Sequence, residues 1–330
     1  MVFVMPFEND MFMHNLYEQK LKRDFHNDKR SPEQIQELFG ALGYENVSQT
    51  ILNRLSKLSN IEGLNLQKRN SHFQDAVEIS EIIDNLVEDI EMDESEMNEL
   101  RFACLVHDVG KSGPAEATPE EQQAFVDVFN LDFNQIIYTV NNHEVTPQEL
   151  TLQQALQIKV DEGDLTEERA DEILTRIVSA GKKQQEKRFE TKIGKKIRMG
   201  LLWSAHVYWS YDILRDQGVD NRVVEVAASH HMIDGHDPAR VGIENVDPQM
   251  ASLELADKYQ AFRVRLVIAD KYQAFRIRGT KTHEQTIEIL RSLVEERLSD
   301  QEKVKQLYLA AVGELDKHKD IFEQELELKN

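Results

Sequence analysis

Residues 100–113 read LRFACLVHDVGKSG, and this stretch decides the fold. Its apolar side chains recur at helical spacing, on a face made of Leu100, Ala103, Cys104 and His107. Such a face packs into a protein core, so the spacing predicts a helix that directs the imidazole of His107 inward. Asp93 and Glu96 have the spacing of a capping box at its start, and Gly110 predicts its end.

The rest of the chain gives the same prediction of helix. Only 14 glycines and 7 prolines interrupt it, and the alternation of apolar and polar residues that marks strands is scarce. A Ser31–Pro32 start signal precedes one helix, and Asn221 is expected to cap another after a loop at 216–220. We therefore predict an all-α protein.

Composition divides the chain into segments. Residues 1–60 are expected to form an N-terminal helical segment, and residues 301–330 an acidic C-terminal helix. Helices at 66–114 are separated from the later ones by a polar stretch at about 115–200. The basic run of that stretch, at 181–198, could attract a phosphorylated substrate or be a solvated helix face.

The charge of the chain is strongly negative, because 39 Lys and Arg residues oppose 60 Asp and Glu residues, which gives −21. This charge argues against binding to bulk nucleic acid. No run of about 18 apolar residues exists, so no membrane span is predicted. The first residues lack the basic region and long apolar stretch of a signal peptide. With one cysteine, which suits a reducing compartment, we expect a cytoplasmic protein.

Four of the eleven histidines lie on apolar helical faces: His72, His107, His206 and His231. One such histidine is more typical of a core residue that is hydrogen-bonded to a carbonyl group. Four are harder to accommodate separately, because each unsatisfied buried imidazole costs about 1–3 kcal/mol. Asp108 and His230 are adjacent to two of them, so convergence on a metal centre would satisfy all. Imidazole and carboxylate without thiolate suit Mn, Fe, Co, Ni, Zn or, with more oxygen ligands, Mg, and among these we expect Fe, Mn or Mg. The number of ligands favours two divalent ions bridged by a carboxylate.

The chain contains one internal repeat, in which LADKYQAFRVR at 255–265 recurs as IADKYQAFRIR at 268–278. The offset of 13 residues corresponds to a rotation of about 220° on a continuous helix. Therefore at most one of Asp257 and Asp270 can point into a given pocket, unless the helix breaks between them.

The order of these residues, His, His-Asp, His, His-His and a late Asp, resembles the HD superfamily of metal-dependent phosphohydrolases. The run at 100–113 is similar to the HDIGK signature of that superfamily. The runs NSHFQDAVEISEIIDNL, SAHVYWSYDILRDQG, AASHHMIDG and DPQMASLELADKYQAF are similar to its HD-GYP branch, which hydrolyses cyclic di-GMP. The likeness covers 66–114 and 200–290. The GYP motif is absent, because HDPAR follows Asp234–Gly235.

The resemblance implies an HD-type helical bundle over residues 61–300, interrupted by a helical insertion at about 115–200. The metal ligands that it implies are His72, His107, Asp108, His206, His230, His231 and Asp257. Asp108 would bridge two ions and Lys111 would contact the scissile phosphate, so these two are the predicted catalytic residues. Lys68 stands where members with three metals carry a glutamate, which favours two metals.

For the last ligand, the residues upstream of the repeat align with the family pattern if the ligand is Asp257. The residues downstream of it align somewhat better if the ligand is Asp270. We prefer Asp257, because its spacing from His231 is nearer to the family pattern.

The expected function is hydrolysis of a phosphoester of a nucleotide or cyclic dinucleotide by a metal-bridging hydroxide. The partner would be a phosphorylated small molecule, with no membrane and no bulk nucleic acid. One alternative is a di-iron oxygenase on the same ligands, and another is an inactive nucleotide-binding receptor. An apolar stripe on a late helix, Leu290, Val294 and Leu298, leaves a homodimer open.

Overall fold

The computed structural model of the chain describes residues 29–60, 71–87, 92–133, 137–141, 143–184, 197–231, 264–275, 281–299 and 302–319. Within these ranges the fold is helical apart from one two-stranded hairpin, which confirms the predicted all-α class. The α-helices are α2 (Pro32–Ala41), α3 (Gln49–Leu58), α4 (His72–Leu86), α5 (Glu94–Val106), α6 (Pro119–Phe129), α7 (Leu152–Asp161), α8 (Glu167–Gln184), α9 (Met199–Asp216), α10 (Asn221–Ala227), α13 (His283–Arg297) and α14 (Glu302–Lys317). Residues 264–275 are helical as well.

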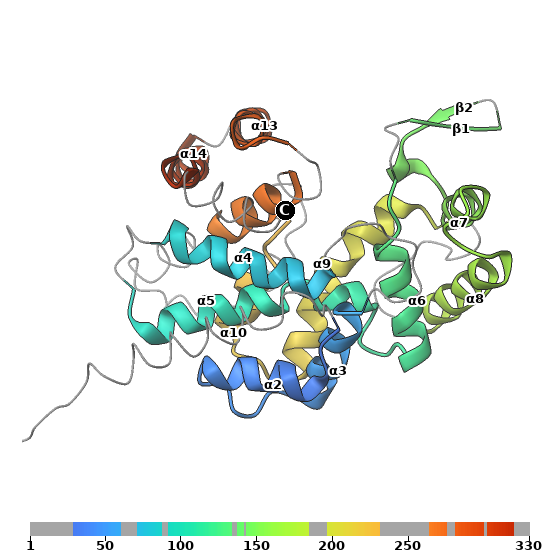
Figure 1. The fold of residues 1–330 in the computed structure, drawn as a ribbon, viewed down its shortest axis with the longest axis horizontal. Helices are drawn as coiled ribbons and strands as arrows, with labels where there is room; N and C mark the ends of the chain where they lie inside the picture. Colours follow the sequence, from blue (N-terminus) through green and yellow to red (C-terminus); the bar gives the residue numbers. More distant parts are fainter. Residues whose placement is uncertain are drawn as a thin grey trace, which may run out of the picture.

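Helix α4 lies at the centre of the bundle. It packs along α5, and α10 packs on α5 from another side, while α2 and α3 lie beneath this pair in the view of Figure 1. Helix α14 and residues 264–275 lie above α4 in the same view. All residues at 71–80 are buried. The polar side chains of α4, among them His72 and Asp75, are therefore buried together with its apolar ones.

Helix α5 starts where its capping box predicts. The backbone N–H of Asp93 donates to Glu96 Oε2 at 3.0 Å, and that of Glu96 donates to Asp93 Oδ1 at 2.9 Å. The helix ends at Val106, and a 3₁₀ turn, η1 (Val109–Ser112), follows. His107 and Asp108 therefore occupy the bend between the two elements, where both side chains are buried.

Two other helix starts test the sequence prediction in detail. Helix α2 begins after Ser31, whose hydroxyl accepts from the N–H of Gln34, as the Ser31–Pro32 signal predicts. The cap of α10 is Asp220, whose carboxylate accepts from Arg222 N at 2.8 Å. The prediction of Asn221 as the cap was wrong by one residue, because Asn221 is the first residue of the helix.

Arg54 of α3 fixes the loop that follows η1. Its guanidinium is 1 % exposed. It donates to Ser112 Oγ (2.9 Å) and to the carbonyl oxygens of Gly113 (3.0 Å), Pro114 (2.8 Å) and Ala115 (2.9 Å). Burial lowers its pKa to about 10, although Glu116 acts in the opposite direction. Because loop carbonyls in a core need donors, this side chain determines where η1, and with it Lys111, can lie.

Helices α6, α7 and α8 and the hairpin form a lobe beside the central bundle, on the right of Figure 1. The hairpin consists of β1 (Tyr138–Val140) and β2 (His143–Val145), which are antiparallel. From the sequence we predict a helical insertion with a turn at His143 and no strand in this stretch. Strands of three residues are too short to show the alternation that identifies a strand.

The segment that contains α7 and α8 begins and ends at neighbouring positions in space. Leu152 N donates to Ile197 O at 2.6 Å, and Met199 N donates to Leu150 O at 2.8 Å. This short antiparallel bridge lies at the start of α9. A segment whose first and last residues are neighbours in space is typical of an insertion. Helix α6, however, also packs against η1 of the central bundle.

Helix α13 packs against α14 at the far side of the bundle. The stripe Leu290, Val294 and Leu298 is buried. These side chains are therefore covered within the chain and form no exposed face for a second copy. The homodimer stays a prediction without that support.

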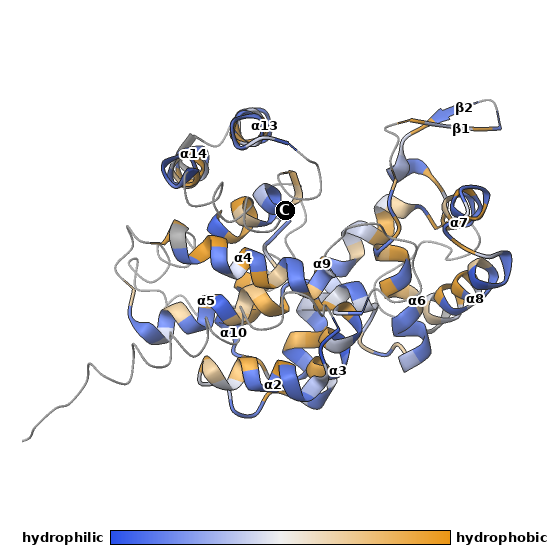
Figure 2. Ribbon diagram, in the orientation of Figure 1, coloured by the Kyte–Doolittle hydropathy of each residue, from blue (hydrophilic) through white to orange (hydrophobic). Residues whose placement is uncertain are grey.

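Hydropathy varies along the peripheral helices. Helices α2, α7 and α8 carry both hydrophobic and hydrophilic residues in bands (Figure 2), as expected where one face packs on a core. In the part of the chain that the structure describes, no helix has the length and apolar character needed to cross a bilayer.

Candidate metal centre

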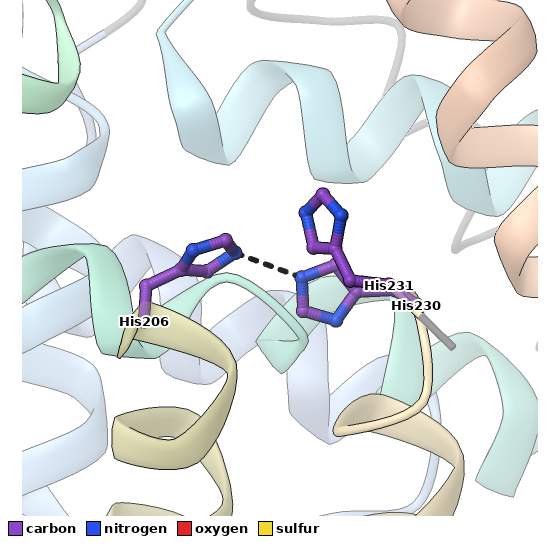
Figure 3. A group of neighbouring side chains, drawn as sticks. All are labelled: His206, His230 and His231. Atoms are coloured by element: carbon purple, nitrogen blue, oxygen red, sulfur yellow. Dashed lines mark hydrogen bonds between the residues drawn. The ribbon is translucent and has the colours of Figure 1, made fainter. Parts of the chain in front are cut away.

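Five of the predicted ligands come together from three segments of the chain. His107 and Asp108 lie at the end of α5, and His206 lies within α9. His230 and His231 follow the end of α10. Figure 3 shows the three last imidazoles gathered in one place, with His206 and His230 turned toward each other.

The carboxylate of Asp108 lies between the imidazoles. Its Oδ1 is 3.3 Å from His206 Nε2 and 3.5 Å from His230 Nε2. Its Oδ2 is 3.4 Å from His107 Nε2. One buried carboxylate therefore faces the same ring nitrogen of three histidines.

The other ring nitrogen of each histidine is fixed by its own helix. Nδ1 lies 2.6 Å from the carbonyl oxygen of Cys104 in His107, and 2.8 Å from that of Ala227 in His230. In His206, Nδ1 is hydrogen-bonded to the carbonyl oxygen of Trp203. A carbonyl oxygen can only accept, so Nδ1 carries the proton in all three. In a neutral imidazole this leaves Nε2 as a lone pair directed into the cluster.

This tautomer creates an electrostatic conflict that a cation would resolve. Nε2 of His206 and Nε2 of His230 are 2.9 Å apart, although both are acceptors and Oδ1 of Asp108 lies beside them. Within the described residues, Nε2 of His107 and Oδ1 of Asp108 are buried and have no hydrogen-bond partner. Buried acceptors need a donor or a positive charge, and a metal ion meets that need for all of them.

Two overlapping sets of side chains could hold metal. His206, His230 and His231 form one, and His107, Asp108 and His230 form the other, with the ligand atoms of each set within 4.8 Å of one another. The predicted His/Asp cluster is therefore present as a buried group that could bind a metal ion. Imidazole and carboxylate donors without thiolate agree with the metals expected from the sequence.

His72, the first residue of α4, joins the cluster through Lys111. The ammonium of Lys111 donates to Asp108 Oδ2 and lies 3.3 Å from His72 Nδ1. Both predicted catalytic residues are thus in contact, and the first predicted ligand lies on the far side of the lysine.

The last predicted ligand, Asp257, lies outside the described residues. Its alternative, Asp270, lies in the helical residues 264–275. Burial would raise the pKa of Asp270, but Lys271, His231 and the neighbouring histidines His230 and His107 lower it to about 2. The carboxylate of Asp270 therefore interacts electrostatically with the histidines of the cluster.

Burial and the Asp108 carboxylate oppose each other in setting the histidine pKa values. Burial lowers the pKa of His206 to about 4 and also lowers that of His230. For His107, burial acts the same way, but the carboxylates of Asp108 and Asp270 and the hydrogen bond to the Cys104 carbonyl together outweigh it and raise the pKa. The pKa of Asp108 lies well below its usual value, because His107 and Lys111 more than offset the effect of its burial.

These shifts predict how the metal-free protein responds to acid. A histidine whose pKa is lower in the folded state makes the unfolded state the better proton acceptor, so stability falls as pH drops from about 6.5 toward 4. His206 alone should cost about 2 kcal/mol between pH 6.5 and 4.5. The pKa of His107 is raised, so His107 makes the protein more stable as pH falls toward 6.5, which is above this window. The pKa values of Asp108 and Asp270 are lowered, so their contribution to stability is lost only below this window. Urea unfolding of chelator-treated protein at several pH values measures this slope.

The matched control is His206→Gln, which removes the titrating group and should flatten the slope. An equal slope in the two proteins would show that His206 does not stay neutral in the folded chain.

Three features of the site were not predicted from the sequence. The carbonyl partners of Nδ1 each lie three residues before their histidine, a spacing that could have indicated them. Ser210 donates to His107 O at 2.6 Å and accepts from Gly110 N at 2.9 Å, and it lies one turn after His206. Lys271 contacts His231, and its place beside Asp270 was the only signal.

Comparison with known proteins gives no match: neither a family model, nor a curated protein, nor a solved structure is significantly similar to this chain. The resemblance to the HD superfamily therefore stays a prediction.

Proposed function

We propose that the chain is a metal-dependent phosphohydrolase of the HD type, which hydrolyses a phosphoester of a mononucleotide or of a linear or cyclic dinucleotide. The observation that supports it most is the surrounding of Asp108. Three Nε2 atoms from separate chain segments converge on this carboxylate, and an ammonium group donates to it.

The side chains of the two overlapping ligand sets would hold the divalent ions. Asp108 contacts His206 of one set and His107 of the other, so its carboxylate could be shared between two ions. His230 belongs to both sets but has one lone pair, at Nε2, and would bind one ion. When bound, such ions supply a water of lowered pKa as the hydroxide nucleophile, and they neutralise charge on the phosphoryl oxygens. The Nδ1 hydrogen bonds to helix carbonyls hold the rings in the orientation that this requires.

We assign the last ligand to Asp270 in preference to Asp257. Val267, three residues before Asp270, is fully buried. If Asp257 of the first repeat copy occupied the position of Asp270, Glu254 would occupy the buried position of Val267. An unpaired buried carboxylate costs several kcal/mol, so the residues upstream of the second copy suit the core and those upstream of the first do not.

Lys111 would present Nζ to the substrate. It is buried and lies in η1, three residues after Asp108. Because the ammonium group of Lys111 lies beside the carboxylate of Asp108, it can contact a phosphoryl oxygen that binds at the metal site there. Arg54 holds the loop after η1 and thereby limits the positions that Lys111 can take.

The test is reconstitution followed by a substrate screen. Chelator-treated protein is loaded anaerobically with Fe²⁺, Mn²⁺ or Mg²⁺, its metal content is measured, and mononucleotides and linear and cyclic dinucleotides are offered. We expect about two ions per chain and metal-dependent release of a phosphate or nucleotide product. Loaded protein that consumes oxygen without hydrolysis would establish the oxygenase instead. Binding without turnover of every nucleotide would establish the receptor.

A further inference from the structure

A second lysine lies at the candidate metal centre. Nζ of Lys271 is 3.2 Å from Nδ1 of His231 and 3.9 Å from Oδ2 of Asp270. Its side chain is 13 % exposed. Lys271 thus reaches the cluster from residues 264–275, whereas Lys111 reaches it from η1.

The two lysines lie near the same two kinds of group. Lys111 contacts the carboxylate of Asp108 and the imidazole of His72, and Lys271 contacts the carboxylate of Asp270 and the imidazole of His231. Each ammonium group therefore lies where one carboxylate and one imidazole would also attract a divalent ion. Metal at those atoms competes with the ammonium for them, and a lysine stem is flexible enough to present Nζ elsewhere.

The charge of the protein makes such a lysine useful. The chain carries a net charge of −21, which repels an anionic substrate. A site for a phosphorylated molecule therefore needs local positive charge that the metal ligands do not neutralise. A mostly buried ammonium group is poorly screened by solvent, so it contributes more to anion binding than an exposed one.

We propose that Lys271 is a second phosphate-binding residue, which together with Lys111 receives the phosphoryl group of the substrate at the metal centre. This inference rests on the proposed phosphohydrolase function. It specifies that function further, because it requires a phosphate-binding site formed by two chain segments, η1 and the helical residues 264–275.

Inorganic phosphate is the probe, and its binding is measured by titration calorimetry on protein loaded with Mn²⁺, so that no turnover is needed. Lys271→Met keeps the length of the stem and removes the charge, and Lys271→Arg keeps the charge. We expect Lys271→Met to weaken phosphate binding about tenfold or more, as the loss of a charge-assisted hydrogen bond does, and Lys271→Arg to restore most of it. Lys317→Met is the control, because that side chain is 64 % exposed and belongs to α14.

Metal content and thermal unfolding of each variant separate the possible failures. If wild-type protein binds phosphate and Lys271→Met binds it equally well, the role of Lys271 is refuted while the proposed function stands. Loss of bound Mn²⁺ in Lys271→Met would also refute it, because the lysine would then act on the metal ligands. Loaded wild-type protein that binds no phosphate would overturn the proposed function itself.

Discussion

Replacing Asp108 with alanine is expected to strip metal from the protein and to abolish the proposed phosphohydrolase activity. The carboxylate contacts Nε2 of His107, His206 and His230 and accepts from Lys111. Losing a partner that only hydrogen-bonds to a ligand typically lowers metal affinity about 10–100-fold. Loss of the carboxylate that contacts histidines of both ligand sets should therefore lower affinity by more than about 100-fold, as elemental analysis after dialysis and titration with Mn²⁺ would measure.

Two variants make this result specific. Asp84→Ala removes a partly buried carboxylate that accepts from Arg101 at 2.9 Å, on α4. It should cost about 1 kcal/mol of stability and leave the metal content unchanged. Asp108→Asn keeps the shape of the side chain and should still lose metal, because an amide cannot supply the negative charge. An Asp108→Ala protein that retains two ions per chain would refute the bridging role.

The fold was predictable because its signals are local. The capping boxes at Ser31 and Asp93 and the helical spacing of apolar residues each depend on residues within one or two turns. The hairpin at 138–145 was missed because each strand has three residues and its turn, at Asn141, lacks a glycine signal. The cap of α10 was displaced by one residue, because Asp220 and Asn221 are both good capping residues and only the backbone decides between them.

The candidate site was predictable in part. Helical spacing identified His107 and His206 as inward-facing, and both lie beside Asp108. On the third segment the spacing selected His231, whereas the fully buried histidine is its neighbour His230 and His231 is only partly buried. Their mutual distances depend on how separate segments pack, which no local pattern specifies. Arg54 is the clearest example of such a residue. A charged side chain within an amphipathic helix is expected at the surface, yet it is buried against a loop some sixty residues away.

Gly110 illustrates how packing brings the separate parts of the site together. A Cβ atom at this position would lie 2.0 Å from the carbonyl oxygen of His206 and 2.5 Å from the backbone nitrogen of Ser210. Both are backbone atoms of α9, so no side-chain rotation can relieve the overlap. The N–H of Gly110 also donates to Ser210 Oγ at 2.9 Å. The close approach of η1 to α9, which puts Asp108 beside His206, therefore requires a residue without a side chain.

Gly110→Ala is accordingly expected to separate η1 from α9 and to destroy the metal centre. Overpacking of a core typically costs about 1–3 kcal/mol, and a clash with two backbone atoms should reach at least about 3 kcal/mol. Urea unfolding measures this loss, and metal content measured on protein that circular dichroism shows to be folded separates damage to the site from unfolding. Gly313→Ala is the matched control, because the same Cβ in α14 meets nothing within 4 Å and should stabilise the helix by about 0.5–1 kcal/mol. If Gly110→Ala binds metal and unfolds like the wild type, then η1 and α9 are not in contact, and Asp108 cannot lie among the histidines as described.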